Sequence, residues 1–495
     1  MDSNHEAYRR LISGTDLRGI ASAGFGKEIT LTPEAAAAAG AAFVRALRRW
    51  QGIDHPYIAV GTDPRLSGAA LKEATMRGLR SEGARCLDCG LSTTPAMFSA
   101  TKAPTGADGA IMITASHLPP ERNGLKFFLP TGGLNASQLR EMVDDMCPVK
   151  HEFSVDKTDH NLLSEYAATL TAFIDPDGSL PLKGMRIVLD AGNGSGGFFA
   201  KVLEDTGAVV DGRYLEPDGR FPNHPANPED AAAMASICAA VQETGADMGI
   251  IFDADCDRAA LVGRGGVPIN RDRLIALVAA VLLNESPGAT IVTDSVTSTG
   301  LAEFIQERGG KHLRFKRGYR NVIDEAIRLQ ESGVDCPCAI ETSGHCALRD
   351  NGYLDDGAYL TAWLLRHFGR LNAEGTDWME LTASLREPAE DAEIRIPLTR
   401  ADFGADANAV LAAVEKAAIE DSTLSLAQDS AEGVRVHCPE GGWFMIRRSV
   451  HDPQLPVNIQ SDNEGGAKSM AQRLLAMLEP LGELMNLESL RNFVS

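Results

Sequence analysis

The sequence has few basic residues relative to acidic ones, few aromatic residues and no long hydrophobic run. Its 495 residues include 47 Lys and Arg against 68 Asp and Glu, which gives a formal net charge of −21. Such a surface excludes a general nucleic-acid-binding protein, which needs a basic face. It also repels anionic ligands, so a phosphate site has to be built locally from Arg, Lys and backbone N–H groups.

Membrane segments and disulfides are also not expected. The longest apolar run, "LIALVAAVLL" at 274–283, is too short to span a bilayer and is interpreted as a buried helix. The N-terminus "MDSNHEAYRRLI" lacks the apolar segment of a signal peptide. Nine scattered cysteines favour reduced thiols in the cytoplasm, and a plastid location would require a transit peptide that has been removed. The CxxC pair Cys86 and Cys89 has no second pair, so two packed thiols are expected rather than a zinc or redox site.

Strand and helix patterns alternate over about 380 residues, which favours layered α/β structure with mixed or parallel sheets. In six segments, four or five apolar residues lead into Asp, Ser, Thr or Gly. These segments are "YIAVGTDPRLSG" (57–68), "GAIMITAS" (109–116), "MRIVLDAGNGSGG" (185–197), "DMGIIFDADCDR" (247–258), "ATIVTDSVTSTG" (289–300) and "CAIETSGH" (338–345). Ligands of α/β sheets bind at the carboxyl ends of the strands, so each loop is a candidate ligand loop.

Helices are expected between these strands. The stretch "LTPEAAAAAGAAFVRALRRW" (31–50) predicts a helix with Thr32 as N-cap and Pro33 as its first residue. The stretch "NPEDAAAMASICAAVQETG" (227–245) is interpreted in the same way. After about residue 390 the pattern changes to short strands with two helices, which indicates a separate α+β domain.

Three aspartates, Asp253, Asp255 and Asp257, alternate directly after an apolar strand. Carboxylates this close repel one another unless a cation lies among them, and hard oxygen ligands suit Mg²⁺. An EF-hand is excluded because Arg258 and Arg264 stand where that loop needs Gly and Glu. A magnesium site is favoured over the alternative, a solvated acidic turn.

The apolar run in "ITASHLPPERNGLKFF" (113–128) ends at Ser116 and is followed by an expected Asn-Gly turn and Lys126. Three acidic ligands leave room at Mg²⁺ for one more anionic oxygen, which a phosphorylated Ser116 could supply. A serine hydrolase is not favoured, because the adjacent His117 is poorly placed as a base and no GxSxG elbow is present.

The segments "TASHLPPERNGLK", "DADCDR" and "ETSGH", in this order, resemble the α-D-phosphohexomutase superfamily, which includes phosphoglucomutase and phosphomannomutase. Smaller matches, "GTDLRG" (14–19), "PDGRFPNHPANP" (217–228) and "GYRNVI" (318–323), extend the resemblance over the whole chain. It implies three topologically similar α/β domains with mixed sheets plus a C-terminal α+β domain, around a central cleft. The implied domains are 1–155 with a phosphoserine loop, 156–267 with a metal-binding loop, 268–388 with a sugar-recognition loop and 389–495 with a phosphate-binding loop.

The resemblance also implies a reaction. Ser116 would pass phosphate to a hexose phosphate, glucose foremost and mannose as well, and regain it from the other end of the bisphosphorylated sugar. One Mg²⁺ per chain would be held by Ser116 and the three aspartates, with glucose 1,6-bisphosphate as activator and intermediate. Lys126 and Arg18 would lie near the proton-transfer position, and Arg258 would steady the transferring phosphate. Because an arginine keeps its proton, Lys126 or His345 is the better general base, although a solvated Lys126 is the alternative.

Further residues are expected to bind the substrate. Glu341 and Ser343 of "ETSGH" would hold sugar hydroxyls, with His345 near the reacting end and Ile340 where the family commonly has Gly. Other expected contacts are His117 and, in "KRGYRN", Gly318, Tyr319 and Arg320. Small hexose phosphates are the expected partners, with neither nucleic acid nor membrane, and the protein is expected to be a monomer or homodimer.

The last loop, "RRSVHDPQLPVNI" (447–459), departs from the family pattern. Arg447, Ser449 and Pro453 match a loop that binds the non-transferring phosphate. The replaced residues are Val450, His451 and Asp452, and, in the serine loop, Leu118. These changes resemble a divergent branch associated with plants and other photosynthetic lineages. Two alternatives stay open: a glucose 1,6-bisphosphate synthase, and an inactive regulatory protein that binds sugar phosphates.

Overall fold

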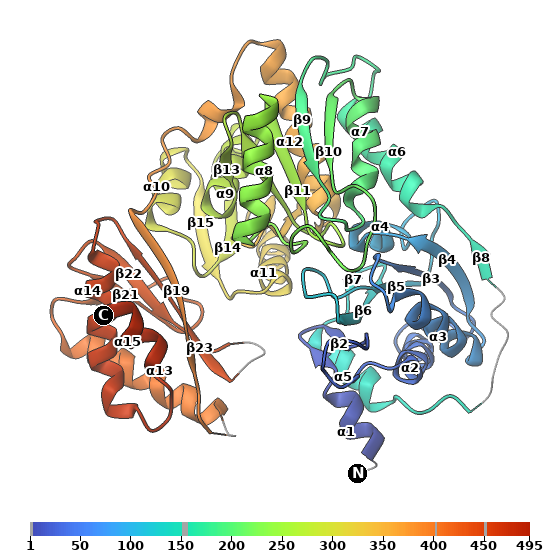
Figure 1. Ribbon diagram of the computed structural model, residues 1–495, viewed down its shortest axis with the longest axis horizontal. Helices are drawn as coiled ribbons and strands as arrows, with labels where there is room; N and C mark the ends of the chain where they lie inside the picture. Colours follow the sequence, from blue (N-terminus) through green and yellow to red (C-terminus); the bar gives the residue numbers. More distant parts are fainter. Residues whose placement is uncertain (1–2, 151–156, 401–402, 450–452) are drawn as a thin grey trace. The chain divides into compact units, whose positions relative to one another are not determined.

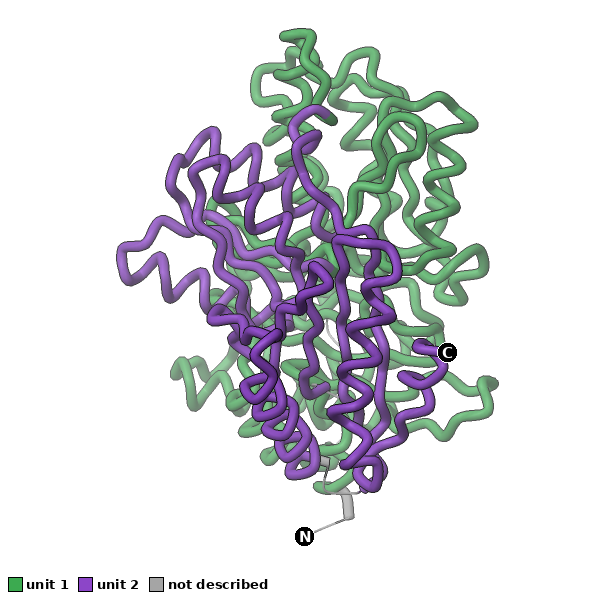
Figure 2. Tube along the Cα trace, turned by 90° about the vertical axis from the view of Figure 1, so that its left-hand side faces the viewer, with its two compact units in different colours: residues 1–270, 343–379 green, residues 271–342, 380–495 purple. Residues whose placement is uncertain are grey.

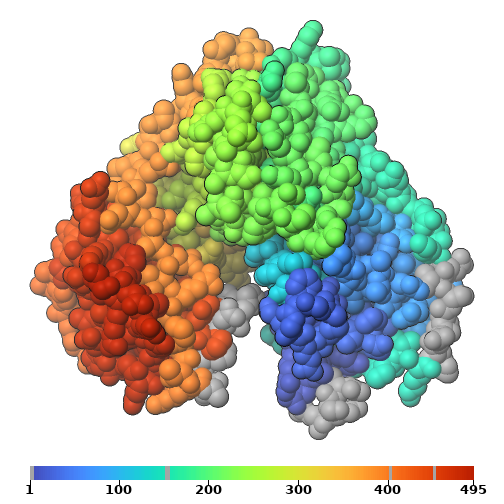
Figure 3. Space-filling view, viewed as in Figure 1, coloured from blue at the N-terminus to red at the C-terminus, as the bar shows by residue number. Residues whose placement is uncertain are grey.

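The computed structural model of the chain describes residues 3–150, 157–400, 403–449 and 453–495, which are coloured in Figure 3. These residues divide into two compact units (Figure 2). Unit 1 consists of residues 1–270 and 343–379, and unit 2 of residues 271–342 and 380–495. Each unit thus combines two segments that are far apart in the sequence.

The first sheet of unit 1 is mixed, as the resemblance implies. Its strands are β1 (Ile12–Ser13), β2 (Asp16–Ile20), β3 (Tyr57–Thr62), β4 (Arg85–Leu91), β5 (Gly109–Ile113), β6 (Arg122–Leu129), β7 (Gly132–Gly133) and β8 (Lys157–Asp159). The strand order is β1-β2-β6-β5-β3-β4-β8, with β7 beside β6. Strand β3 runs parallel to β4 and β5, whereas β6 runs antiparallel to β5 and β2. The carboxyl ends of β3 and β5 therefore lie at one edge of the sheet.

The helices that accompany this sheet are α1 (Ser3–Arg9), α2 (Pro33–Gln51), α3 (Gly68–Ser81), α4 (Thr94–Ser99) and α5 (Ala136–Asp144). The prediction for 31–50 is confirmed, because the Thr32 side chain accepts the Ala35 N–H and Pro33 begins the helix. The alanine-rich face of α2 packs closely on α3. A Cβ atom on Gly78 would lie 1.9 Å from the Ala37 carbonyl oxygen, so this helix pair requires glycine there.

The second sheet of unit 1 has the order β10-β9-β11-β12-β13. Its elements are α6 (Leu162–Ile174), β9 (Arg186–Asp190), η1 (Gly196–Phe198), α7 (Phe199–Asp205), β10 (Val209–Arg213), α8 (Ala231–Thr244), β11 (Met248–Phe252), β12 (Ala259–Gly263) and β13 (Val267–Ile269). The helix predicted over 227–245 begins later than expected. Asp230 caps it by accepting the Ala232 and Ala233 N–H groups, whereas Asn227 accepts the Glu229 N–H in a preceding turn.

Unit 1 also contains a later segment of the chain, with β17 (Cys346–Leu348), η2 (Arg349–Asn351), β18 (Leu354–Asp355) and α12 (Gly357–Ala373). Helix α12 packs on α6. The Tyr166 hydroxyl of α6 lies 2.7 and 2.6 Å from the two carboxylate oxygens of Asp356, the N-cap of α12. This buried contact fixes the later segment to the second sheet's helices.

Unit 2 begins with a parallel group of strands. Its elements are α9 (Arg271–Glu285), β14 (Thr290–Asp294), α10 (Thr299–Glu307), β15 (Lys311–Phe315), α11 (Tyr319–Glu331) and β16 (Cys338–Ile340). Strand β14 runs parallel to β15 and β16. Residues 274–283 of α9 are all buried, which confirms the prediction of a buried helix.

The C-terminal part of unit 2 is a five-stranded antiparallel sheet with the order β19-β23-β22-β21-β20 (Figure 1). Its elements, preceded by η3 (Trp378–Thr382), are β19 (Glu390–Pro397), α13 (Phe403–Glu420), β20 (Ser425–Leu426), β21 (Val434–Cys438), β22 (Gly442–Ile446), β23 (Gln454–Ser461), α14 (Gly466–Leu478), η4 (Glu479–Leu481) and α15 (Glu488–Val494). One face of the sheet forms an apolar core with these helices. The α+β character predicted for this region is therefore present.

The nine cysteines are thiols that form no disulfide, and Cys86 and Cys89 are packed within β4. Burial raises the pKa of both thiols to about 12, which leaves them uncharged and unreactive. Among the described residues, each helix is too short or too polar to cross a membrane.

Candidate active site

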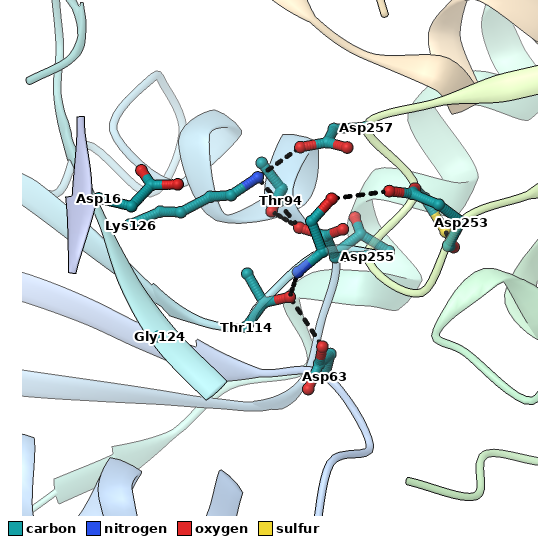
Figure 4. A network of polar contacts seen from close by, with 12 residues as sticks. Asp16, Asp63, Thr94, Thr114, Gly124, Lys126, Asp253, Asp255 and Asp257 are labelled. Atoms are coloured by element: carbon teal, nitrogen blue, oxygen red, sulfur yellow. Dashed lines mark hydrogen bonds and ion pairs between the residues drawn. The ribbon is translucent and has the colours of Figure 1, made fainter. Parts of the chain in front are cut away.

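Ser116 lies in a buried loop just after β5 and has an unusual backbone conformation. Its φ is +53°, in the left-handed region that non-glycine residues rarely adopt, and the residue is 1% exposed. Its N–H donates to Thr114 Oγ1 at 2.8 Å, and the Thr114 hydroxyl donates to Asp63 at 2.7 Å (Figure 4). The Ser116 hydroxyl in turn donates to Asp253 Oδ2 at 3.0 Å. The loop thus holds this hydroxyl against the predicted metal ligands.

A buried arginine after β3 holds the backbone of the serine loop. Arg65 forms an ion pair with Asp63 at 3.0 Å, with both side chains fully buried. Its guanidinium donates to four carbonyl oxygens of the loop, those of Ser116 at 2.5 Å, Leu118 at 2.7 Å, Pro119 at 2.8 Å and Arg122 at 2.9 Å. One planar group with five donors therefore fixes the loop that carries the candidate nucleophile.

The motif "PDGRFP" (217–222), in the segment after β10, contacts this arginine and the chain beside it. The Arg65 guanidinium lies 5.1 Å from the ring centroid of Phe221. A Cβ atom on Gly219 would lie 2.3 Å from the Pro64 carbonyl oxygen and 2.5 Å from Arg65 Cα. The motif therefore backs the serine loop through Arg65.

The three aspartates after β11 converge as predicted. Each of Asp253, Asp255 and Asp257 offers a carboxylate oxygen, and these oxygens all lie within 4.8 Å of one another. Thr94, in the first turn of α4, donates its hydroxyl proton to Asp255 Oδ2 at 2.5 Å. All three carboxylates are buried, so the cluster is not a solvated turn.

Lys126 reaches this cluster from the middle of β6. Its ammonium group lies 3.2 Å from Asp255 Oδ2 and makes a shorter contact with Asp257 Oδ2 (Figure 4). The residue is buried, so the alternative of a solvated lysine is wrong.

The predicted Asn-Gly turn before this lysine is also wrong. Asn123 and Gly124 lie within β6 and pair with β2. A Cβ atom on Gly124 would lie 2.4 Å from the Leu17 carbonyl oxygen and 2.7 Å from that of Thr114. The glycine is therefore explained by close strand packing and not by turn geometry.

The electrostatics of the aspartate cluster fit a divalent cation. Burial raises the pKa of Asp253 well above its usual value, and the neighbouring Asp257 and Asp255 carboxylates add to this rise. Burial acts in the same direction on Asp257, but Lys126 outweighs it and the pKa of that carboxyl is lowered. Asp255 Oδ1 and Asp257 Oδ1 are buried without a hydrogen-bond partner in the described part of the chain. Unpartnered carboxylate oxygens in one cluster are the ligands that Mg²⁺ prefers.

His345 and Arg258 lie together beside this cluster, both in unit 1. Arg258 Nε donates to His345 Nε2 at 2.9 Å, and His345 Nδ1 lies 2.5 Å from Asp355 Oδ2. Because the Arg258 guanidinium can only donate, Nε2 is the acceptor of this bond. Arg258 also pairs with Glu229 at 3.3 Å.

Two more predicted residues join this group. The pKa of His117 is lowered to about 2 by the Arg258 guanidinium and by burial, so this imidazole is neutral. Its Nδ1 lies 3.4 Å from the Ser116 hydroxyl oxygen. Arg18, on β2, forms an ion pair with Asp16 at 2.8 Å.

The predicted recognition residues divide between the two units. In unit 2, the Gly318 N–H donates to Glu341 Oε1 at 2.6 Å, so the "KRGYRN" loop and the end of β16 contact each other. Tyr319 begins α11, and Arg320 pairs with Asp324 of the same helix at 2.8 Å. Ser343 belongs to unit 1, and its buried hydroxyl has no hydrogen-bond partner among the described residues.

The candidate phosphate loop of unit 2 follows β22. Arg447 is buried, and its N–H donates to the Pro456 carbonyl oxygen at 3.1 Å, which extends the pairing of β22 with β23. The Ser449 N–H donates to the Gln454 carbonyl oxygen at 3.1 Å. The divergent positions Val450, His451 and Asp452 lie outside the described residues.

Three residues of the site were not identified from the sequence. Arg65 lies in the loop after β3 and Thr94 begins α4 after β4, and their position after neighbouring parallel strands is the signal that could have found them. Asp355 directly precedes the N-cap of α12 in "GYLDDG", where two adjacent acids before an apolar helix are the available signal.

Comparison with protein families gives matches over most of the chain. Family models described as phosphoglucomutase/phosphomannomutase, alpha/beta/alpha domains I, II and III match residues 9–146, 164–266 and 270–385. The phosphoglucomutase of Neisseria gonorrhoeae is 32% identical over 479 residues, covering 95% of this chain and 97% of that protein. The phosphomannomutase/phosphoglucomutase of Pseudomonas syringae pv. tomato is 31% identical over 417 residues, covering 83% of this chain and 84% of that protein.

A solved structure shows the same fold over nearly the whole chain. The crystal structure of a phosphoglucomutase/phosphomannomutase family protein from Burkholderia thailandensis superposes with a TM-score of 0.78 at 27% identity. The superposition covers 95% of this chain and 98% of that one.

Proposed function

The chain belongs to the phosphoglucomutase/phosphomannomutase family and is a phosphohexomutase, and from this premise we propose which reaction it runs and with which residues. It interconverts hexose 1-phosphates and hexose 6-phosphates, with glucose as the main sugar and mannose as a second one. The observation that carries the proposal is the buried Ser116 hydroxyl, 3.0 Å from a cluster of three carboxylates.

Ser116 carries the phosphoryl group in this proposal. Its Oγ–P bond breaks as a bond forms from phosphorus to a hydroxyl oxygen of the sugar phosphate, which gives a hexose bisphosphate such as glucose 1,6-bisphosphate. The phosphate at the other end of that sugar then returns to Ser116. The contacts of Arg65 with the loop carbonyls support this role, because phosphoryl transfer depends mainly on positioning and charge stabilisation.

Asp253, Asp255 and Asp257, with an oxygen at Ser116, would hold one Mg²⁺. When bound, the ion polarises the phosphoryl oxygens and offsets their charge. The Arg258 guanidinium, 3.9 Å from Asp253, is placed to stabilise charge on the transferring group.

The proton of the attacking hydroxyl needs an acceptor in unit 1. We assign His345 as this acceptor: its Nε2 accepts from Arg258 Nε at 2.9 Å and would take the proton when Arg258 turns to the phosphoryl group, and its Nδ1 lies 2.5 Å from Asp355 Oδ2. Lys126 is an ammonium between two carboxylates and becomes a base only if it transfers a proton to a partner first. Arg18 and His117, on the same side of unit 1, are assigned to orient the substrate.

Recognition of the sugar and of the second phosphate is assigned to the remaining loops. Glu341 and Ser343 would accept and donate hydrogen bonds to sugar hydroxyls. Arg447 and Ser449 would bind the phosphate that is not transferred. Gly318, Tyr319 and Arg320 would line the sugar site from α11. In this assignment, residues 1–155, 156–267, 268–388 and 389–495 contribute one loop each.

The test is phosphorus NMR of the purified protein with Mg²⁺ and glucose 1-phosphate or mannose 1-phosphate, each with and without a trace of glucose 1,6-bisphosphate. We expect conversion to the 6-phosphate by the wild type, none by Ser116→Ala, and normal conversion by Ser137→Ala, whose side chain is exposed on α5. Intact turnover by Ser116→Ala would show the mechanism to be wrong. Net accumulation of the bisphosphate from another phosphate donor would instead assign the chain as a bisphosphate synthase.

A further inference from the structure

Arg447 is a buried cation whose charge is poorly compensated in unit 2. The residue is 6% exposed, and its Nε has no hydrogen-bond partner among the described residues. One guanidinium nitrogen donates only a weak bond, 3.4 Å long, to the Arg448 carbonyl oxygen. A buried guanidinium with open donors requires an anion, because leaving it unpaired costs far more than an exposed charge would.

The sheet register shows what faces this arginine. In antiparallel pairs, opposite residues share a face and alternate residues along a strand return to it. Glu393 of β19 is opposite Asn458 of β23, which is opposite Met445 of β22. Arg447 follows Met445 by two positions and continues the same ladder. Glu393 and Arg447 therefore lie on one face of the C-terminal sheet.

A second arginine reaches this face from the other segment of unit 2. Arg317, just before α11, lies 3.7 Å from Glu393 Oε2 through Nη1 and 3.7 Å from Asp294 Oδ2 through Nε. Both distances exceed that of a charge-assisted hydrogen bond, so neither carboxylate forms a close paired bond with this guanidinium. Burial lowers the pKa of Arg447 and the Arg317 guanidinium lowers it further, whereas the Glu432, Glu393 and Asp294 carboxylates raise it.

The other carboxylates nearby already accept bonds from neutral groups. Asp294 accepts the Thr342 hydroxyl at 2.7 Å. Glu432 accepts hydrogen bonds from the Ser295 hydroxyl at 2.5 Å and from the backbone N–H of Arg317 at 2.9 Å. Glu393 accepts from Arg395 Nε and Nη2 at 2.9 and 2.8 Å through Oε1, whereas its Oε2 makes only a 3.5 Å contact with the Asn458 amide and lies 3.7 Å from Arg317. Glu393 Oε2 is therefore the carboxylate oxygen that an incoming anion has to replace beside Arg317, while Oε1 stays paired with Arg395.

We propose that Arg317 is a second phosphate ligand, which with Arg447 clamps the non-transferring phosphate of the sugar, and that Glu393 is the counter-charge which yields Arg317 on binding. This inference deepens the proposed function, because it rests on the phosphate loop at Arg447 and adds a residue from a different loop. Two guanidiniums from two segments of unit 2 can each form paired bonds to one phosphate. The site then selects a doubly charged phosphate over a neutral sugar.

The test measures binding without turnover, in full-length protein carrying Ser116→Ala. Calorimetry is run with glucose 6-phosphate, inorganic phosphate and glucose for Arg317→Gln, Arg447→Gln, the double variant and Glu393→Gln. We expect each single arginine change to weaken glucose 6-phosphate binding about tenfold. The double variant should lose less than the product of the two effects, because both residues hold one phosphate. Glu393→Gln should tighten binding about threefold, since the competing carboxylate is removed.

Arg328→Gln is the matched control, because that arginine also belongs to the α11 region and is largely exposed. Arg317→Lys keeps the charge and should bind within about threefold of the parent, which tests the site even if Arg317→Gln folds poorly. Binding by Arg317→Gln within twofold of the parent, or weaker binding by Glu393→Gln, would overturn the inference. If the wild type converted no hexose phosphate while Arg317→Gln still lost inorganic phosphate, the proposed function would fail and the anion site would stand.

Discussion

At the scale of single residues, the aspartate cluster concentrates more negative charge than its protein partners offset. Burial and the two neighbouring carboxylates raise the pKa of Asp253, so repulsion within the cluster destabilises the folded chain when no metal is bound. The cluster therefore favours metal binding over the metal-free folded state.

We predict that Asp253→Asn has opposite effects on stability with and without metal. In EDTA at pH 8 the variant should melt about 2–4 °C above the wild type, because one repelling charge is gone. In millimolar Mg²⁺ it should melt below the wild type, because it binds the ion more weakly. Scanning calorimetry under both conditions checks this. Asp159→Asn, on an exposed carboxylate, should move neither midpoint. Equal shifts in the two buffers would contradict a metal site here.

Arg65 binds the loop that carries Ser116, the proposed phosphoryl carrier, and its side chain is fully buried. Its removal by Arg65→Met would leave Asp63 as a buried unpaired charge and four carbonyl oxygens of the serine loop without their donor. We expect a loss of about 3–5 kcal/mol in the free energy of unfolding. We also expect phosphoryl transfer from Ser116 to slow by about a hundredfold, measured in a single turnover with phosphorylated protein.

The variant Arg65→Lys separates the effect of the charge at residue 65 from the effect of its bonds to the loop carbonyls. It keeps the ion pair with Asp63 but cannot bond four carbonyls at once, so transfer should stay slow while most of the stability returns. Arg85→Met removes an exposed arginine from β4 and serves as control. Full transfer activity in Arg65→Lys would show that the four carbonyl contacts do not matter for catalysis.

At the scale of elements, strands that end in polar loops were predictable and the contacts between loops were not. Apolar runs of the right length identify β5, β11 and β14, and the carboxyl-end rule places their loops together. The Asn-Gly pair at 123–124 looks locally like a turn, but long-range pairing with β2 overrides this local preference. The sheet-edge position of Arg65 could be predicted but its role could not, because the four carbonyl oxygens that it binds lie more than 50 residues away in the sequence.

The start of α9 gives a pH-dependent prediction. Burial raises the pKa of Asp272 from 3.8 to about 6, even though its Oδ2 accepts the Ser298 N–H at 3.1 Å. Between pH 4 and 6 the folded state therefore binds more protons than the unfolded state, so stability falls as the pH rises. The free energy of unfolding that is lost over this range amounts to about 3 kcal/mol, and the loss is complete above pH 6.

Asp272→Asn should remove that contribution while keeping the acceptor for Ser298. Urea unfolding of both proteins at pH 4.5 and pH 7.5 checks this, with the variant gaining relative to the wild type only at the higher pH. Asp324→Asn, at a half-exposed carboxylate on α11, is the control. An equal difference at the two pH values would mean that Asp272 does not titrate in this range.

At the scale of the whole molecule, the C-terminal sheet is joined to residues 271–342 in one compact unit. One of its faces covers the apolar core with α13 and α14, and the other meets the loop after β14 through Trp443, Met445 and Val296. The sequence predicts a separate α+β domain because local patterns describe strands and helices but not the polar residues that join two sheets.

Arg435 is the main polar link in this join. Its Nη1 donates to the Ser295 and Thr297 carbonyl oxygens at 3.0 and 3.1 Å, and its guanidinium lies 3.6 Å from the Trp443 ring centroid. Arg435→Met keeps the length of the side chain but removes the donor to the Ser295 carbonyl oxygen and leaves the Thr297 carbonyl oxygen with only the 3.3 Å bond from Arg314. We expect unit 2 to lose about 3 kcal/mol of stability, since each lost partner costs about 1–3 kcal/mol.

The order in which the two segments unfold tests the role of Arg435 more directly than the loss of stability does. If Arg435 couples the two segments of unit 2, the variant should unfold with the C-terminal sheet melting ahead of residues 271–342. Hydrogen exchange of β21 and β22 should then speed up more than that of β14. Arg395→Met, on an exposed arginine of the same sheet, should leave both rates unchanged. Equal acceleration in β14 and β22 would mean that the two segments unfold together with or without this arginine. The remaining contacts, which include Arg314 with Asp429, Ser295 with Glu432 and Trp443 with Val296, would then be sufficient to join them.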